Sequence, residues 1–180
     1  MRREAPILAI TQPGAPQLLR RTLDHLASIK LLGKREIIIV DNWSRDISTK
    51  QILEAAKTWA TEICPKFQIP RRYVPLFTIN AAFKALRPDA PYAVILEAGA
   101  TPSKDDLSLL EQALAEVEKL AIAFDAIQVG RPKTLLATKK CYETLLRKGF
   151  FKDQPLAGDL PWDQIAGTMQ AEGLHVVVMN

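Results

Sequence analysis

A run of β-branched residues that ends on an acid constrains this chain more than any other feature of its sequence. Ile37 to Val40 are four consecutive β-branched residues, and Asp41, Asn42 and Ser44 follow them. Such a run is typical of a parallel strand that is buried on both faces. Because open α/β sheets bind ligands at the carboxyl ends of their strands, we expect Asp41 to lie at a ligand-binding edge.

Predicted strands and helices alternate along the sequence. The expected strands cover residues 6–11, 36–41, 72–76, 92–96, 126–129, 134–137 and 175–179, and the expected helices begin near residues 16, 48, 80, 103, 139 and 161. The short strands at 126–129 and 134–137 are expected near a sheet edge. This order predicts an α/β fold with a mostly parallel central sheet and helices on both faces. The length of 180 residues suits a single domain over residues 1–180.

Two of the predicted helices begin with capping signals. Ser48 with Gln51 has the form of a capping box, and the helix that follows is expected to carry an apolar stripe as far as Ile63. Ser103 with Asp106 three residues later marks the start of another helix in the same way.

The composition excludes several classes of protein. An apolar content of 48% can fill one core, and the apolar stretch at residues 7–10 is far too short for a signal peptide or a membrane span. Cys64 and Cys141 lack metal-binding or disulfide-framework spacing, so we expect both to pack as small apolar groups in a reducing, cytoplasmic compartment. The net charge of +4 comes from scattered Lys and Arg, which does not favour nucleic-acid binding.

Familiar motifs of other α/β proteins are missing. The first predicted loop, residues 11–16, holds one glycine, whereas a dinucleotide-binding turn needs several. The sequence contains no Gly-x-x-x-x-Gly-Lys-Ser/Thr phosphate loop and no Gly-x-Ser-x-Gly nucleophile turn. Its two histidines offer no His-rich metal site and no obvious Ser-His pair.

Two motifs carry a resemblance to a known family. Residues 40–46 match the Val-Asp-Asn/Asp-x-Ser-x-Asp strand end of the GT-A glycosyltransferases, particularly family 2, and Thr11, Gln12 and Pro13 take the place of the family's Pro-Thr-Tyr-Asn-like loop. The order of segments is similar to the family over most of the chain. The resemblance implies a single Rossmann-like GT-A domain that transfers a sugar from a nucleotide-diphosphate donor to an acceptor hydroxyl.

The resemblance also implies which residues bind the nucleotide. In the family the first motif aspartate contacts the nucleobase, which assigns that role to Asp41. A carboxylate can accept the imide N–H of uracil, so a UDP-sugar is the favoured donor. The other nucleotide-binding candidates are Thr11, Gln12, Pro13, Asn42, Ser44 and Asn80. Since Asp, Asn and Ser are also preferred in loops and helix caps, a purely local role is the alternative for residues 41–46.

The family's metal motif is reduced to one acid in this chain. Glu97, Ala98 and Gly99 follow the strand at 92–96, where the family has an Asp-x-Asp motif that holds a divalent metal on the donor diphosphate. A single Glu97 could bind Mn²⁺ or Mg²⁺ together with water and substrate phosphate, so the metal affinity is expected to fall. A solvated strand end is the alternative interpretation of Glu97.

Two late acids compete for the role of general base on the acceptor. Asp159 has about the expected separation from Gly149, and Asp163 lies in a Pro-x-Asp sequence that resembles related glycosyltransferases. We rank Asp163 first. A carboxylate suits the role because the acceptor hydroxyl need lose its proton only as the anomeric bond breaks. Both acids also lie near a helix start, where the helix dipole alone favours them.

Two other functions compete with glycosyl transfer. A catalytically degenerate GT-A domain, which binds a nucleotide or a partner without chemistry, would account for the missing second acid. A nucleotidyltransferase is disfavoured, because the first loop lacks the Gly-rich Arg/Lys segment that such enzymes use on triphosphates.

Overall fold

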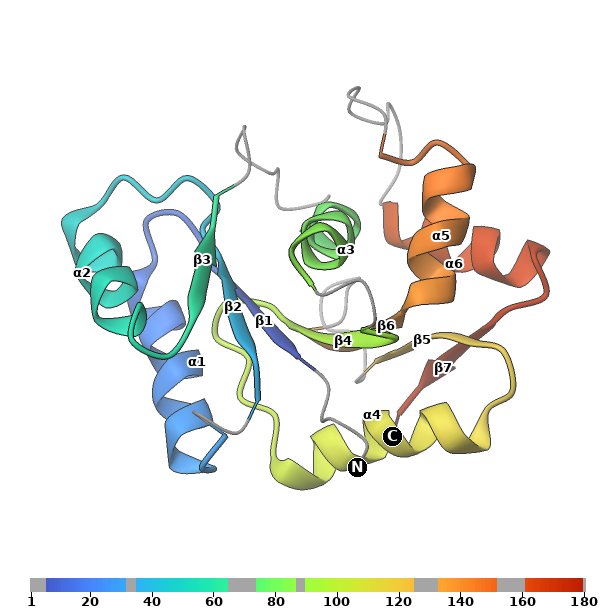
Figure 1. Cartoon of the computed structure of the whole chain (residues 1–180), viewed down its shortest axis with the longest axis horizontal. Helices are drawn as coiled ribbons and strands as arrows, with labels where there is room; N and C mark the ends of the chain where they lie inside the picture. The colour runs from blue at the N-terminus through green and yellow to red at the C-terminus, as the bar shows by residue number, and fades with distance from the viewer. Residues whose placement is uncertain are drawn as a thin grey trace.

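Seven strands form one mixed sheet across the middle of the molecule (Figure 1). The computed structural model describes residues 6–31, 35–64, 74–86, 90–124, 133–151 and 161–179. The strands are β1 (Ile7–Ile10), β2 (Ile37–Val40), β3 (Thr61–Ile63), β4 (Tyr92–Leu96), β5 (Leu120–Phe124), β6 (Thr134–Thr138) and β7 (His175–Val178). Their order is β3-β2-β1-β4-β6-β5-β7, and β6 runs antiparallel to both of its neighbours while the other pairs are parallel.

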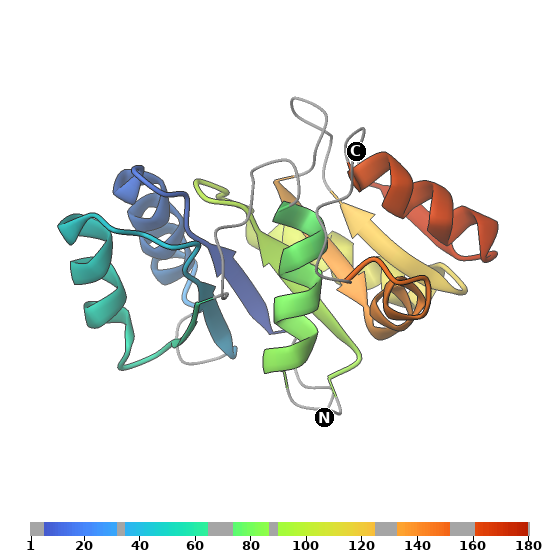
Figure 2. The same ribbon diagram turned by 90° about the horizontal axis from the view of Figure 1, so that it is seen from above.

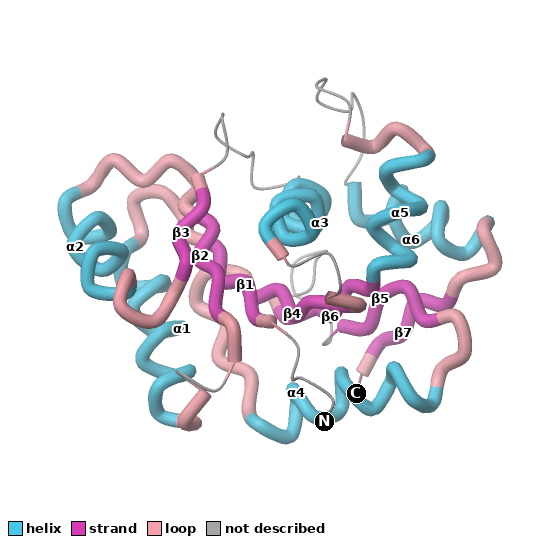
Figure 3. Tube along the Cα trace, in the orientation of Figure 1, coloured by secondary structure: helices cyan, strands magenta, loops and turns pink. Residues whose placement is uncertain are grey.

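Helices cover both faces of the sheet, as the sequence predicts. The helices are α1 (Pro16–Ser28), α2 (Ile47–Ala56), α3 (Val74–Ala85), α4 (Lys104–Glu116), α5 (Lys139–Arg147) and α6 (Pro161–Ala171). Helices α1, α2 and α4 lie on one face, and α3, α5 and α6 lie on the other (Figures 1 and 3). The view from above shows α3 passing in front of the sheet (Figure 2). None of the described helices is long and apolar enough to cross a membrane.

The β-branched run forms β2, a strand that is buried on both faces. Ile38 and Val40 belong to the core beneath α3, α5 and α6, whereas Ile37 and Ile39 belong to the core beneath α1, α2 and α4. Each of these four side chains is at most 2% exposed. Full burial of such a side chain stabilises the fold by about 1.5–3 kcal/mol, so this strand anchors both layers.

The carboxyl ends of β1, β2 and β4 meet at one edge of the sheet. Register pairs Ile10 with Val40 and Leu96 with Thr134, so the antiparallel β6 begins at the same edge at which β4 ends. After β1 the chain moves to β2 and β3 on one side, and β4 then pairs with β1 on its other side. The sheet order therefore reverses between β1 and β4, which is where doubly wound sheets bind ligands.

The second helix differs from the prediction at both ends. It begins at Ile47 rather than at the predicted capping box of residues 48–51, because Asp46 is the N-cap and accepts a 2.7 Å hydrogen bond from the Thr49 backbone N–H. It ends at Ala56, and the apolar residues expected on its continuation form a turn and the short edge strand β3. The capping box of Ser103 and Asp106 at the start of α4 is confirmed.

Three further segments depart from the prediction. Residues 74–76, expected in a strand, lie in α3, whereas residues 72–73 and the strand expected at 126–129 are outside the described residues. Strand β5 at Leu120–Phe124 was not expected, since its apolar residues follow a helical stripe without a turn signal. The strand predicted at 134–137 is β6, which lies inside the sheet between β4 and β5 rather than near an edge.

Candidate functional site

The first two strands bring Thr11 and Asp41 together at the carboxyl edge of the sheet. The Thr11 N–H donates to the Val40 carbonyl, and the Asp41 N–H donates to the Ile63 carbonyl, so both residues continue the sheet hydrogen bonding past the strand ends. The Thr11 hydroxyl donates to Asp41 Oδ1 over 3.0 Å. Thr11 is 2% exposed and Asp41 is 7% exposed, so this carboxylate is largely withdrawn from water before any ligand binds.

The hydroxyl of Thr11 uses its full hydrogen-bonding capacity in this cluster. In addition to donating to Asp41, it accepts from the Asn42 backbone N–H over 2.7 Å and from the Ser44 hydroxyl over 3.2 Å. A threonine hydroxyl has one donor and two acceptor positions, and all three are occupied. The Ser44 backbone N–H donates to Asp41 Oδ1 over 3.2 Å. Both described bonds to the carboxylate thus fall on Oδ1, and Oδ2 takes neither.

Trp43 is a feature of this loop that the sequence prediction did not use. Its φ of 60° lies in the left-handed region, and its side chain is 39% exposed. A non-glycine residue in that region costs about 1–3 kcal/mol and persists only where its surroundings enforce it. The enforcing contacts are those that hold Asn42 and Ser44 on either side of it. The loop therefore exposes a large indole two residues after a buried carboxylate.

Cys64 follows β3 at the same edge and does not pack as predicted. It is exposed, whereas Cys141 is buried as expected. Partial desolvation and the negative charge of Asp41 raise the pKa of the Cys64 thiol, and a hydrogen bond to the Trp43 backbone opposes this. Burial raises the pKa of the Cys141 thiol to about 12. The 2.8 Å hydrogen bond from the Asp41 N–H to the Ile63 carbonyl places the end of β3, which Cys64 follows, beside Asp41.

Gln12, Pro13 and Asn80 were the remaining nucleotide-binding candidates. Gln12 and Pro13 lie in the turn after Thr11 and are half-buried. Asn80 lies in α3, on the opposite side of the sheet from α1, and the described contacts do not join it to Asp41. Its Oδ1 atom is buried without a hydrogen-bond partner among the described residues. A buried, unpaired amide oxygen is costly in a folded protein, so Asn80 has an unused acceptor.

The loop after β4 holds Glu97 at the edge of the sheet. The Glu97 N–H donates to the Lys133 carbonyl over 2.8 Å, and the Ala100 N–H donates to the Glu97 carbonyl over 2.9 Å. Gly99 has a φ of 86°, and a Cβ there would lie 3.1 Å from a Leu18 methyl carbon. The position therefore requires glycine for its backbone conformation and for its packing against α1.

The residues described near Glu97 do not fit a metal site made by the protein alone. Within the described ranges, no group of three or more His, Cys, Asp or Glu side chains could hold a metal ion. Glu97 is followed by Ala98 and Gly99, which provide no side-chain oxygen. A metal ion at Glu97 would therefore depend on ligands from water and substrate.

The structure places Asp163 in the first turn of α6, where its side chain is exposed. Helix α6 contacts α3 and leads into β7, whose amino end pairs with that of β5. The carboxyl end of α6 therefore lies at the amino edge of the sheet, and its amino end points toward the opposite, carboxyl edge. The described contacts do not bring Asp163 into the Thr11 and Asp41 cluster. Asp159, the competing candidate, lies outside the described residues.

Comparison with known proteins identifies the architecture. No protein-family model and no curated protein matches the sequence. A mannosyltransferase from Pyrobaculum calidifontis, solved in complex with GDP-mannose and Mn²⁺, matches with a TM-score of 0.72 and 15% identity over 98% of this chain. The chain spans 55% of the length of that enzyme.

Two other solved structures have the same architecture. A glucosyl-3-phosphoglycerate synthase from Mycobacterium tuberculosis, in complex with Mn²⁺, uridine diphosphate and phosphoglyceric acid, matches with a TM-score of 0.66 and 11% identity, over 98% of this chain and 68% of that one. The 4-diphosphocytidyl-2C-methyl-D-erythritol synthase of Anaerococcus prevotii matches with a TM-score of 0.59 and 14% identity, over 98% of this chain and 86% of that one. This chain has the GT-A fold of the nucleotide-diphospho-sugar transferases.

Proposed function

We propose that this protein binds a nucleotide-diphosphate sugar at the carboxyl edge of β1 and β2 and transfers the sugar to an acceptor hydroxyl. The observation that carries the proposal is the buried carboxylate of Asp41, fixed by Thr11 and Ser44 beside the point at which the sheet order reverses. The fold neighbours that were solved with GDP-mannose or uridine diphosphate support a nucleotide-sugar donor.

Asp41 would recognise the base of the donor. Thr11 and Ser44 donate to Oδ1, so the carboxylate presents Oδ2 as an acceptor for a ligand N–H. Uracil carries an imide N–H that suits this acceptor, which favours a UDP-sugar. Trp43, which is exposed and lies two residues after Asp41, would stack on the base, since aromatic side chains stabilise stacked bases by about 1–3 kcal/mol.

The diphosphate would lie along the loop after β4. Glu97 is the candidate contact for a divalent metal ion on the phosphates, and such an ion would complete its coordination with phosphate and water oxygens. When bound, the ion would neutralise charge on the leaving nucleotide. The Gly99 backbone lets this loop approach α1 closely, because Thr22 accepts a 3.0 Å hydrogen bond from the Gly99 N–H.

Asp163 would accept the proton of the acceptor hydroxyl. As an exposed carboxylate in the first turn of α6, it can reach an acceptor that approaches from solvent. Asp159 is the alternative base. We further propose that residues 1–180 act as one GT-A-like domain and, since the two cysteines of the sequence lack the number and spacing of a disulfide framework, that the protein works in a reducing compartment such as the cytoplasm.

The experiment that tests this function measures release of UDP or GDP from UDP-glucose, UDP-galactose and GDP-mannose, with and without a panel of sugar and polyol acceptors. The account predicts nucleotide release that increases with one acceptor. Tight binding of nucleotide without release under any condition would instead favour a degenerate, binding-only GT-A domain. Failure of all nucleotides and nucleotide sugars to bind would contradict both.

A further inference from the structure

A pocket opens at the same edge of the sheet as the Thr11 and Asp41 cluster, on the side of α1 and α4. Its volume is about 330 Å³. The lining residues come from α1, the loop after β4, α4, the start of β6 and the residue after β7, and they include Arg21, Asp106, Leu109, Leu110, Lys133 and Met179. Neither Asp41 nor Asp163 lines it, and it shares only the loop after β4 with the site proposed for the donor.

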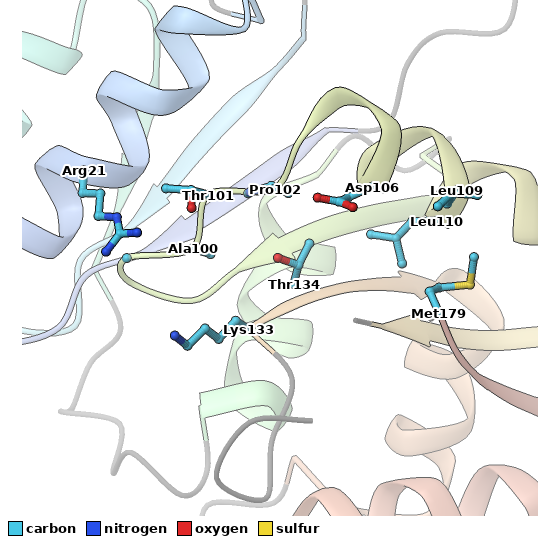
Figure 4. A pocket seen from close by; sticks show the side chains of 11 residues that line it. Arg21, Ala100, Thr101, Pro102, Asp106, Leu109, Leu110, Lys133, Thr134 and Met179 are labelled. Atoms are coloured by element: carbon cyan, nitrogen blue, oxygen red, sulfur yellow. The ribbon is translucent and has the colours of Figure 1, made fainter. Parts of the chain in front are cut away.

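Two cationic side chains lie at one end of the pocket. Figure 4 shows the Arg21 guanidinium and the Lys133 ammonium at that end, on either side of Ala100. The neighbours of Arg21 fix its position on α1, because Thr22 accepts from the Gly99 N–H and the His25 Nε2 atom lies 2.6 Å from the Pro102 carbonyl oxygen. Within the described residues, Arg21 forms no ion pair.

The other end of the pocket is apolar. Leu109, Leu110 and Met179 lie together there in Figure 4, and Leu109 is 40% exposed although it is a large hydrophobic residue. Thr134 and Asp106 lie between the two ends. One carboxylate oxygen of Asp106 accepts from the Ser103 N–H over 2.7 Å as part of the capping box of α4.

We propose that this pocket binds a small phosphate monoester whose phosphate lies between Arg21 and Lys133 and whose compact apolar body lies against Leu109, Leu110 and Met179. Two cations match the double negative charge of a phosphate monoester, and Arg adds paired donors in a planar arrangement. The volume of about 330 Å³ lies at the lower end of the range for small-molecule pockets, which fits a body of one ring.

Phenyl phosphate, titrated by calorimetry, is the probe that tests this inference. Inorganic phosphate and phenol serve as its separate halves. The variants are Arg21→Gln and Lys133→Gln at the cationic end and Leu109→Asn at the apolar end. Arg20→Gln is the matched control, because Arg20 is an exposed cation on the same helix that lines a different hollow beside α2. Circular dichroism checks that each variant retains the fold.

The proposal predicts that phenyl phosphate binds at least about tenfold more tightly than either half. Arg21→Gln and Lys133→Gln should each weaken binding by about tenfold or more, as expected for loss of a charge-assisted hydrogen bond. Leu109→Asn should reduce the advantage of phenyl phosphate over inorganic phosphate, and Arg20→Gln should change nothing.

Three results would overturn the proposal. The first is the absence of phenyl phosphate binding at millimolar concentration. The second is an equal loss in Arg20→Gln and Arg21→Gln, which would mean that the probe senses only the general positive charge of α1. The third is displacement of phenyl phosphate by saturating UDP, which would assign it to the nucleotide edge. Because the test does not depend on turnover, it can succeed or fail independently of the proposed glycosyl transfer.

Discussion

The side chains of Thr11 and Asp41, 30 residues apart in the sequence, are joined by a 3.0 Å hydrogen bond at the carboxyl edge of the sheet. The same threonine hydroxyl accepts from Asn42 and Ser44, so one side chain of the first strand end organises the whole loop that follows the second. The candidate site is therefore held in place by contacts within the chain, and one hydroxyl takes part in several of them. Preorganisation of this kind reduces the entropy that a ligand must overcome.

Thr11→Val should destabilise the protein by about 1–3 kcal/mol, because the substitution keeps the shape of the side chain but leaves the Asn42 N–H and the Ser44 hydroxyl without their acceptor in a buried position. Urea unfolding followed by circular dichroism measures the loss. Thr11→Ser retains the hydroxyl and should lose less. Equal unfolding midpoints for the valine variant and the wild type would show that the cluster does not hold the loop.

Asp163→Asn should abolish sugar transfer while leaving the affinity for the donor nucleotide unchanged. The carboxylate lies in the first turn of α6, away from the Asp41 cluster, so its loss affects proton removal rather than base recognition. Turnover and calorimetry on the same preparation separate the two effects. Undiminished turnover in Asp163→Asn, with loss in Asp159→Asn, would transfer the role of base to Asp159.

Manganese should tighten the binding of UDP only modestly, by less than about tenfold, because Glu97 alone replaces the acids of the Asp-x-Asp motif. Glu97→Gln should remove the difference between titrations with and without Mn²⁺. Glu62→Gln, which changes an exposed acid of β3, is the control and should preserve it. A large Mn²⁺ effect that survives Glu97→Gln would mean that other residues hold the ion.

The pair of helices α5 and α6 carries an ion-pair cluster that makes stability depend on pH. Arg147 and Lys148 lie within 2.5 and 2.6 Å of the two oxygens of Glu172. Hydrogen bonds from these residues lower the pKa of Glu172 from 4.5 to about 2. Because the pKa is depressed in the folded state, the stabilisation is present above pH 4.5 and is lost as the pH falls toward 2.

Glu172→Gln should therefore lower the urea midpoint of unfolding by a constant amount near neutral pH. The difference from the wild type should shrink as the pH falls. The effect will be small, since the cluster is exposed and screened by salt. Urea unfolding across the acid range measures it, and Glu143→Gln, which removes an exposed carboxylate of α5 outside the cluster, provides the comparison. A difference that grows under acid would contradict the assigned cause.

Local signals in the sequence predict most of the fold. The buried run of β2 and the capping box of Ser103 and Asp106 each depend on neighbouring residues alone, and the structure confirms both. The errors occur where tertiary context decides. The residues at 61–63 fit a helical stripe as well as a strand, and only pairing with β2 selects the strand. Strand β5 begins four residues after α4 ends, without a glycine or proline between them.

The sequence names candidate residues for the site, but it does not indicate the contacts between them. The motif at residues 40–46 indicates Asp41, and the structure adds the hydrogen bond from Thr11, which requires the register of β1 and β2. The left-handed backbone of Trp43 has no local sequence signal, because tryptophan rarely adopts it. The pocket on the side of α1 and α4 joins residues from five segments, including Arg21 and Met179, and no motif within one segment indicates it.

Calorimetric titration of UDP into the wild type and into Asp41→Asn tests the central claim most directly. The account predicts that UDP binds the wild type and that Asp41→Asn weakens it by about ten- to a hundredfold, as expected for loss of a hydrogen bond to a charged group. Asp24→Asn, at an exposed position of α1, should bind UDP as the wild type does. Equal affinity of UDP for the wild type and Asp41→Asn, or no binding of UDP to either, would contradict the assignment of this edge as the nucleotide site.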